Sequence, residues 1–181
     1  VIEMPWADKV KGILNCILGG EASGSAAADI LFGDVNPSGK MVDTIAKSYD
    51  CYPCKEDFWE CFDHVDYSDD IYVGYRFFET IPGAKDYVRY PFGFGLSYTS
   101  FEISGKVCTE SEGQIVAVCT VKNTGEVAGK EVVQLYYSAP YTAGGIEKAH
   151  VVLGDFAKTE EIAAGNGKAT VTLELDVRDL A

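Results

Sequence analysis

The sequence predicts an α/β part followed by an all-β part of the immunoglobulin-like sandwich class. Three observations lead to this fold class: helical spacing of apolar residues over residues 10–32, a glycine-rich aromatic connector at residues 90–96, and alternation of apolar and polar residues after residue 100. Apolar residues make up 47% of the 181-residue chain and charged residues 24%, which is the balance of a folded chain of one or two domains.

Two helices are expected near the start of the chain. Apolar side chains at i, i+3, i+4, i+7 and i+8 predict a helix over residues 10–18, with Cys16 inside its apolar stripe. A second helix is predicted from Ala22 to Phe32, closed by Gly33, because glycine adopts the left-handed conformation that ends a helix. An α/β layer needs several strands covered by helices, so we expect most of its sheet to precede Val1.

The next segment leads to a domain boundary. Residues 43–70, called the polar excursion below, are rich in aspartate, tyrosine and cysteine and show no sustained period. Residues 71–78 are predicted to be extended, because aromatic and β-branched side chains are enriched there. The connector at residues 90–96 is punctuated by glycines and marks the expected boundary. We therefore expect one domain over residues 1–95, with the connector, and a β-sandwich over residues 96–181.

The second domain is predicted from five strand patterns. They are separated by turn signals such as the one at residues 123–125. The patterns cover residues 101–107, 115–121, 133–137, 151–156 and 169–177. An immunoglobulin-like sandwich has about seven strands, so the final strands are expected to follow Ala181.

The net charge bears on the partners of the protein, and its cysteine usage bears on its location. Fifteen basic and 28 acidic residues give a net charge of −13, which repels phosphate backbones and anionic lipid, so we expect no nucleic acid and no membrane as partner. No apolar run approaches the ~20 residues of a membrane span. The six cysteines do not resemble a disulfide framework in a chain of this length, and a reducing, cytoplasmic location is expected.

Seven motifs, in order along nearly the whole chain, resemble glycoside hydrolase family 3, and its β-glucosidases in particular. They are EMPW (3–6), GGEA (19–22), ADILFGDVNPSGK (28–40), DIYVGYR (70–76), YPFGFGLSYT (90–99), VKNTG (121–125) and GKEVVQLY (129–136). The resemblance implies that residues 1–95 are the C-terminal part of the family's α/β sandwich domain. Residues 96–181 would then be its fibronectin type III-like β-sandwich.

The resemblance also implies which chemistry lies outside this chain. Family members are retaining glycosidases, in which one carboxylate forms the glycosyl-enzyme and a second acts as general acid and base. The nucleophile lies in a barrel domain and the acid/base loop precedes the EMPW segment, so no catalytic residue is expected here. The chain would be a non-catalytic portion of a retaining β-glucosidase that hydrolyses terminal β-D-glucosyl residues of β-glucosides or cello-oligosaccharides. Its partners would be the remaining α/β and barrel parts of the same enzyme, and no cofactor is expected.

An alternative is a stand-alone carbohydrate-binding or protein-interaction module. That function requires a closed sandwich, whereas five strands ending on an alternating one would leave a long exposed edge, which stable free modules avoid. The sequence therefore favours the enzyme portion over the module.

Two sets of candidate site residues lie in the polar excursion. Phe58 and Trp59 have no evident core to enter, and loops of this family domain border the sugar-binding cleft, so they are candidates for contact with outer substrate subsites. Cys51, Cys54, Cys61 and His64 offer four zinc ligands by type. The spacing between the two pairs is short for a zinc ribbon, and we favour separate thiols and no metal.

Overall fold

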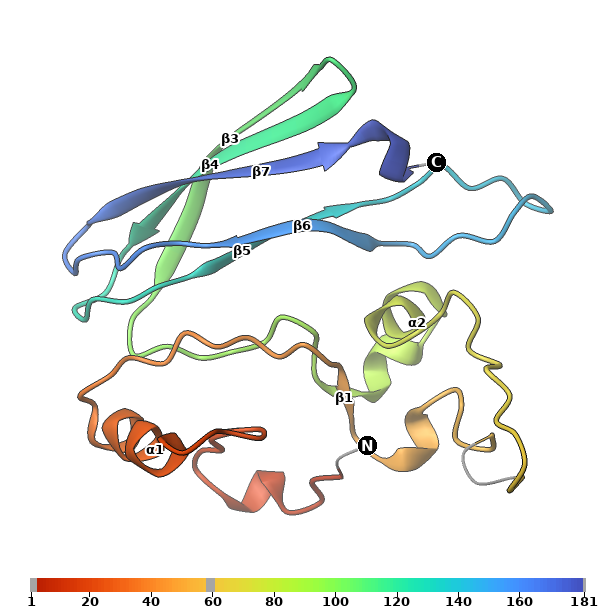
Figure 1. Ribbon diagram of the computed structural model, residues 1–181, viewed down its shortest axis with the longest axis horizontal. Coiled ribbons are helices and arrows are strands. Elements are labelled where there is room, and N and C mark those ends of the chain that lie inside the picture. Colours follow the sequence, from red (N-terminus) through yellow and green to blue (C-terminus); the bar gives the residue numbers. More distant parts are fainter. Residues whose placement is uncertain (1–2, 58–60, 181) are drawn as a thin grey trace.

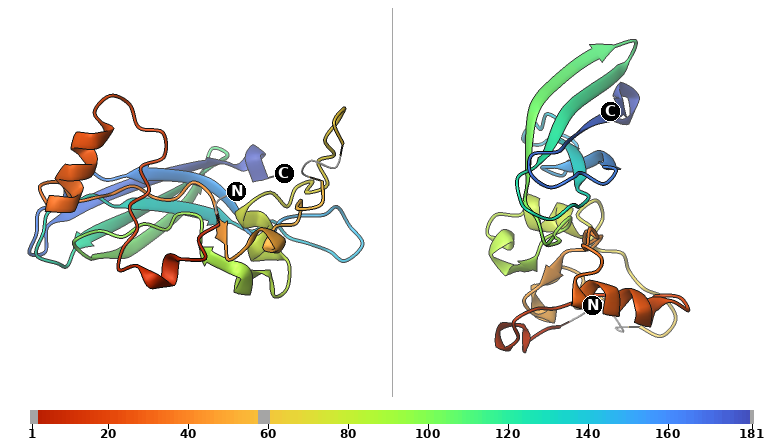
Figure 2. Two further views of the ribbon diagram at one scale, coloured as in Figure 1. Left: turned by 90° about the horizontal axis from the view of Figure 1, so that it is seen from below. Right: turned by 90° about the vertical axis from the view of Figure 1, so that its left-hand side faces the viewer.

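The chain forms two layers in the computed structural model, which describes residues 3–57 and 61–180. The first half of the chain is the lower layer of Figure 1, where short helices and loops surround a two-stranded sheet. A β-sandwich forms the upper layer, and the right-hand view of Figure 2 shows the same stacking from the side.

The lower layer contains short elements. In chain order they are η1 (Ala7–Lys9), α1 (Ser23–Phe32), β1 (Ile45–Ala46), η2 (Tyr49–Cys51), α2 (Tyr75–Thr80), η3 (Ala84–Tyr87) and β2 (Val88–Tyr90). Strands β1 and β2 pair in antiparallel fashion, and a small core lies on each side of them. Within the described ranges, no helix reaches the length and hydropathy that crossing a membrane requires.

One of the two predicted N-terminal helices is confirmed. Helix α1 covers Ser23–Phe32, and Gly33, with φ of 85°, closes it by donating its N–H to the carbonyls of Asp29 and Ile30. The predicted helix over residues 10–18 is wrong: the segment is irregular and exposed throughout, and Cys16 is exposed with it. An isolated helix of that length is marginal unless another element covers its apolar stripe, and Gly12 weakens it further.

The segment over residues 71–78 also differs from the prediction. Instead of an extended strand, the chain enters helix α2 at Tyr75. Gly74, with φ of 59°, turns the chain into the helix, and Phe78 is then buried at 2% exposure between Ala46 and Ala84. Burial of an aromatic side chain outweighs the strand preference of the same residues.

The five predicted strands of the upper layer are confirmed. They are β3 (Phe101–Ser111), β4 (Gln114–Asn123), β5 (Val132–Tyr137), β6 (Val152–Lys158) and β7 (Lys168–Asp176), followed by η4 (Val177–Leu180). All pairings are antiparallel, with one sheet in the order β3-β4-β7 and the other pairing β5 with β6.

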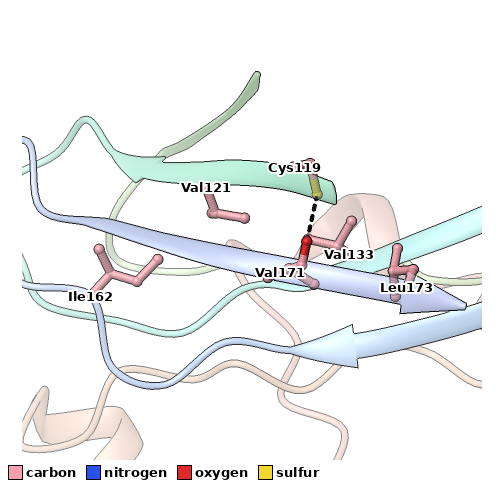
Figure 3. Close-up of a cluster of buried hydrophobic side chains, with 6 residues drawn as sticks. All are labelled: Cys119, Val121, Val133, Ile162, Val171 and Leu173. Carbon is pink, nitrogen blue, oxygen red and sulfur yellow. Dashed lines mark hydrogen bonds between the residues drawn. The ribbon is translucent and has the colours of Figure 1, made fainter. Parts of the chain in front are cut away.

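The core of the sandwich lies between these two sheets. Strand β7 alternates as predicted, burying Val171, Leu173 and Leu175 while the residues between them face outward. Figure 3 shows Val171 and Leu173 packed with Val121 and Val133, and Cys119 lies among them as the small buried side chain that its strand position predicts. The apolar face is therefore fixed by the period of the sequence.

A buried amide closes one end of this core. Asn123 is completely buried, and its Nδ2 donates to the carbonyls of Val127 (2.8 Å) and Ile162 (3.1 Å). Its Oδ1 accepts from the Thr99 hydroxyl (2.6 Å) and from the N–H of Gly125 (3.0 Å). One side chain thus satisfies polar groups from four loop positions.

Candidate functional site at the junction of the two layers

The junction between the layers is held first by Asn36, in the turn after α1. Its Nδ2 donates to the carbonyl of Ala128 (2.9 Å) in the upper layer. Its Oδ1 accepts from the Ser97 hydroxyl and from the N–H of Tyr98, both at 2.9 Å. A Cβ on Gly129 would lie 2.5 Å from the same Nδ2, so the close approach requires glycine there. Three segments are therefore joined by a single amide.

An ion pair lies beside this amide. Lys40 Nζ is 2.7 Å from Glu131 Oε1, and the two side chains are only 18% and 16% exposed. Lys40 also donates to the carbonyl of Gly95 (3.1 Å), while Glu131 accepts from the N–H of Val132 (2.7 Å). A pair this well screened from solvent and supplied with further hydrogen bonds is costly to break from one side.

Tyr75, at the start of α2, makes the third connection. Its hydroxyl accepts from the N–H of Leu153 on β6 at 2.8 Å. Its ring lies 4.8 Å from that of Phe92 in the connector and meets Tyr136 of β5 edge-on at 6.0 Å. Aromatic pairs of this geometry add to the free energy gained by burial alone. Helix α2, the connector and the β5–β6 sheet are thereby packed together.

A fourth set of contacts lies at one end of the molecule. Both Figure 1 and the left view of Figure 2 show the polar excursion and the β5–β6 loop projecting from the same end. The Tyr72 hydroxyl donates to the Glu147 carboxylate there, and the N–H of His150 donates to the Thr80 hydroxyl at 2.8 Å. The hydrogen bond to Glu147 raises the pKa of the Tyr72 phenol. The β5–β6 loop is thus tied to Tyr72, just after the excursion, and to the last residue of α2.

Of the predicted site residues, Phe58 and Trp59 lie outside the described residues. The cysteines and the histidine are distributed over three environments: Cys51 lies against the Ser48 hydroxyl, Cys54 beside Asp69, and Cys61 and His64 line a hollow of about 260 Å³. Over residues 3–57 and 61–180, no three His, Cys, Asp or Glu side chains are arranged to hold a metal ion. All six cysteines are free thiols.

The thiol of Cys54 is expected to alkylate slowly. Burial, together with the carboxylate of Asp69, raises the pKa of this thiol above its usual 9.0. Since only the thiolate is nucleophilic, a raised pKa leaves less of the reactive form at pH 8. Mass spectrometry after a short iodoacetamide pulse should find Cys108, which is exposed on β3, labelled well before Cys54. Equal rates at the two positions would contradict the described environment.

The chemistry of the junction is that of a scaffold. Its amide, ammonium, carboxylate and phenol groups each have a partner within the chain, whereas an acid–base site presents such groups to a substrate. Asn36, Lys40 and Glu131 were not predicted from the sequence as a set. Residues 36–39 have the composition of a turn, which says nothing about a partner 92 residues away.

Family models match both parts of the chain. The model of the glycosyl hydrolase family 3 C-terminal domain covers residues 1–98, and that of the fibronectin type III-like domain covers residues 131–181. The first match alone spans more than half of the chain.

Relatives and solved structures agree with these models. The chain is 46% identical to Beta-glucosidase A of Butyrivibrio fibrisolvens and 44% identical to a Beta-glucosidase of Ruminococcus albus, matching over 100% of its own length in both cases. It covers only 24% and 19% of those proteins, so it spans a quarter or less of their length.

Two solved structures illustrate the similarity of fold. A beta-glucosidase from Paenibacillus barengoltzii matches 100% of this chain, over 20% of its own, with a TM-score of 0.88 and 40% identity. Beta-glucosidase 3B from Thermotoga neapolitana, in complex with glucose, matches 99% of this chain, over 25% of its own, with a TM-score of 0.89 and 38% identity. Family models, sequence identity and fold agree, and the chain belongs to glycoside hydrolase family 3.

Proposed function

We propose that this chain is a non-catalytic portion of a retaining β-glucosidase, and that it supports the parts that carry the two carboxylates. The observation that carries the proposal is the open face of helix α1. None of its ten described residues is buried, and Leu31 and Phe32 are 72% and 83% exposed. A short helix with an uncovered apolar face needs further protein to pack against.

The substrate class follows from the relatives. They are named as beta-glucosidases, and one solved neighbour holds glucose. We infer that the intact enzyme hydrolyses terminal β-D-glucosyl residues of β-glucosides or cello-oligosaccharides with two carboxylates supplied from outside residues 1–181. The remaining α/β and barrel parts of that enzyme would be the partners of α1. The open face of α1 argues against a self-sufficient binding module.

Within such an enzyme, the junction would hold the sandwich in a fixed orientation. Asn36, Lys40 and Tyr75 join the layers without a free linker, which supports a boundary near residues 95–96 that is packed rather than flexible. The six free thiols are in keeping with a reducing, cytoplasmic compartment.

Activity measurements test the proposal directly. The full-length protein that contains this chain should hydrolyse 4-nitrophenyl β-D-glucoside, while the purified 181-residue chain should release no 4-nitrophenol above the rate of buffer. The two proteins are assayed at equal concentration. Turnover by the isolated chain, or an inert full-length protein, would show that the proposed function is wrong.

We further propose that Phe58 and Trp59 contribute to the outer substrate subsites of the intact enzyme. Loss of a ring that stacks on a sugar weakens substrate binding, so Trp59→Ala is expected to raise KM for cellobiose about tenfold, with a smaller change in kcat. Trp6→Ala, at an exposed aromatic residue before η1, is the matched control. An unchanged KM for Trp59→Ala would remove the residue from the subsites.

A further inference from the structure

We propose a binding site for a neutral polyol the size of a monosaccharide in the cavity between β1, α2 and the connector. The cavity has a volume of about 320 Å³, which is at the lower end of the ~300–1,000 Å³ of small-molecule sites. It is lined by residues 42–44, residues 73–76 and Phe92. Figure 1 shows β1 and α2 side by side where these segments meet.

Thr44, which lines the cavity, carries a buried hydroxyl that lacks a partner in the described part of the chain. Thr44 is 6% exposed, and its Oγ1 forms no hydrogen bond with any of the described residues. Its backbone carbonyl is already occupied, since it accepts from the Tyr52 hydroxyl at 3.2 Å. A buried hydroxyl without a partner is unfavourable, so we expect a rotation about χ1 of Thr44 to turn this oxygen toward a group that enters the cavity.

The lining of the cavity carries one charge of each sign. Asp43 supplies a carboxylate and Arg76 a guanidinium, and over residues 3–57 and 61–180 neither forms an ion pair. A charged ligand would be attracted by one of these groups and repelled by the other. A ligand with several hydroxyl groups satisfies both, because each hydroxyl donates to the carboxylate and accepts from the guanidinium or from Thr44.

Two aromatic rings form an apolar wall of the cavity. The rings of Tyr75 and Phe92 lie 4.8 Å apart, and the Tyr75 hydroxyl is fixed by the N–H of Leu153. Rings held in this way, tilted by 36° to each other, offer an apolar wall to the C–H face of a sugar or cyclic polyol. Gly74 at the rim has φ of 59°, a conformation that other residues rarely adopt, and it leaves that rim without a side chain.

Methyl NMR of the full-length protein tests the site with D-glucose as the probe. Val42 and Val73 line the cavity, so their methyl signals are expected to shift in a saturable titration. Arg76→Met should weaken that titration about tenfold or more, and Thr44→Val several-fold, because each removes hydrogen bonds to the ligand. Arg178→Met and Thr142→Val, at positions that do not line the cavity, are the matched controls and should titrate as the wild type does.

A crystal structure of the same full-length protein soaked in D-glucose is the second test. Density for the sugar between Phe92 and the Thr44 hydroxyl supports the proposal. Water alone in the cavity, a segment from elsewhere in the protein bonded to Thr44, or variants that titrate like the wild type would each overturn it. The methyl signals report on this cavity and hydrolysis is measured separately, so this inference and the proposed function can fail independently.

Discussion

Replacing Asn123 with alanine is expected to destabilise the β-sandwich by about 4 kcal/mol. The change removes the four hydrogen bonds of a completely buried side chain, each worth about 1 kcal/mol. It also leaves the carbonyls of Val127 and Ile162 without the amide that they share. Changes of this size are near the upper end of what a single substitution produces.

Hydrogen exchange followed by mass spectrometry measures this effect where it occurs. Peptides from β4 and β7, which pair along their whole length, should exchange much faster in Asn123→Ala than in the wild type. Thr124→Val, at the neighbouring position, is the matched control. The Thr124 hydroxyl makes one exposed hydrogen bond, to the carbonyl of Ser100, so its loss should lower the free energy of unfolding by less than about 1 kcal/mol. Similar protection in the two variants would mean that the buried amide does not hold the end of the core.

The second large effect is expected from Glu131→Gln. This change leaves the Lys40 ammonium without its carboxylate, although the Lys40 side chain is only 18% exposed. We expect the free energy of unfolding to fall by about 2–3 kcal/mol, which is less than the ~3–5 kcal/mol lost when a fully buried pair is broken. The double variant Lys40→Met/Glu131→Leu should recover much of that loss, because it removes both charges at once.

A double-mutant cycle in urea separates the pair from its surroundings. The exposed pair of Lys85 and Glu79 serves as the control; its atoms are 3.0 Å apart, but the Lys85 side chain is 74% exposed. Its coupling should stay below about 1 kcal/mol, as is usual for surface pairs. Equal coupling energies for the two pairs would show that the junction does not depend on Lys40 and Glu131.

The parts of the fold that could be predicted are those determined by residues close together in the sequence. Strand β7 alternates because one of its faces is buried, and α1 ends at Gly33 because the chain turns left-handed there. The helix over residues 10–18 was predicted from the same kind of pattern, and yet the segment is irregular. No described element covers that stripe, so local preference decides. Helix α1 is equally uncovered, but its three alanines favour a helix and Gly33 caps it, whereas residues 10–18 contain Gly12 and three β-branched residues.

The junction could not be predicted for a different reason. Asn36 and Ala128, or Lys40 and Glu131, are brought together by the packing of two layers that are far apart in sequence. No period or spacing encodes such a pair, and without the fold an asparagine in a turn is only a turn residue. The resemblance to family 3 carried the functional prediction, whereas the cavity next to Thr44 became visible only with the packing of β1 against α2.

The way the connector is held also decides how this sandwich can be exchanged between relatives. Met41 donates its N–H to the carbonyl of Phe94, and Gly93 donates its N–H to the carbonyl of Met41, so two hydrogen bonds hold the connector to Met41. A chimera that takes a foreign sandwich from residue 96 onward would keep a surface fitted to the old one. A chimera therefore has to exchange two separate segments together. One is the connector with the sandwich, and the other is the short stretch at residues 36–41 that contacts them.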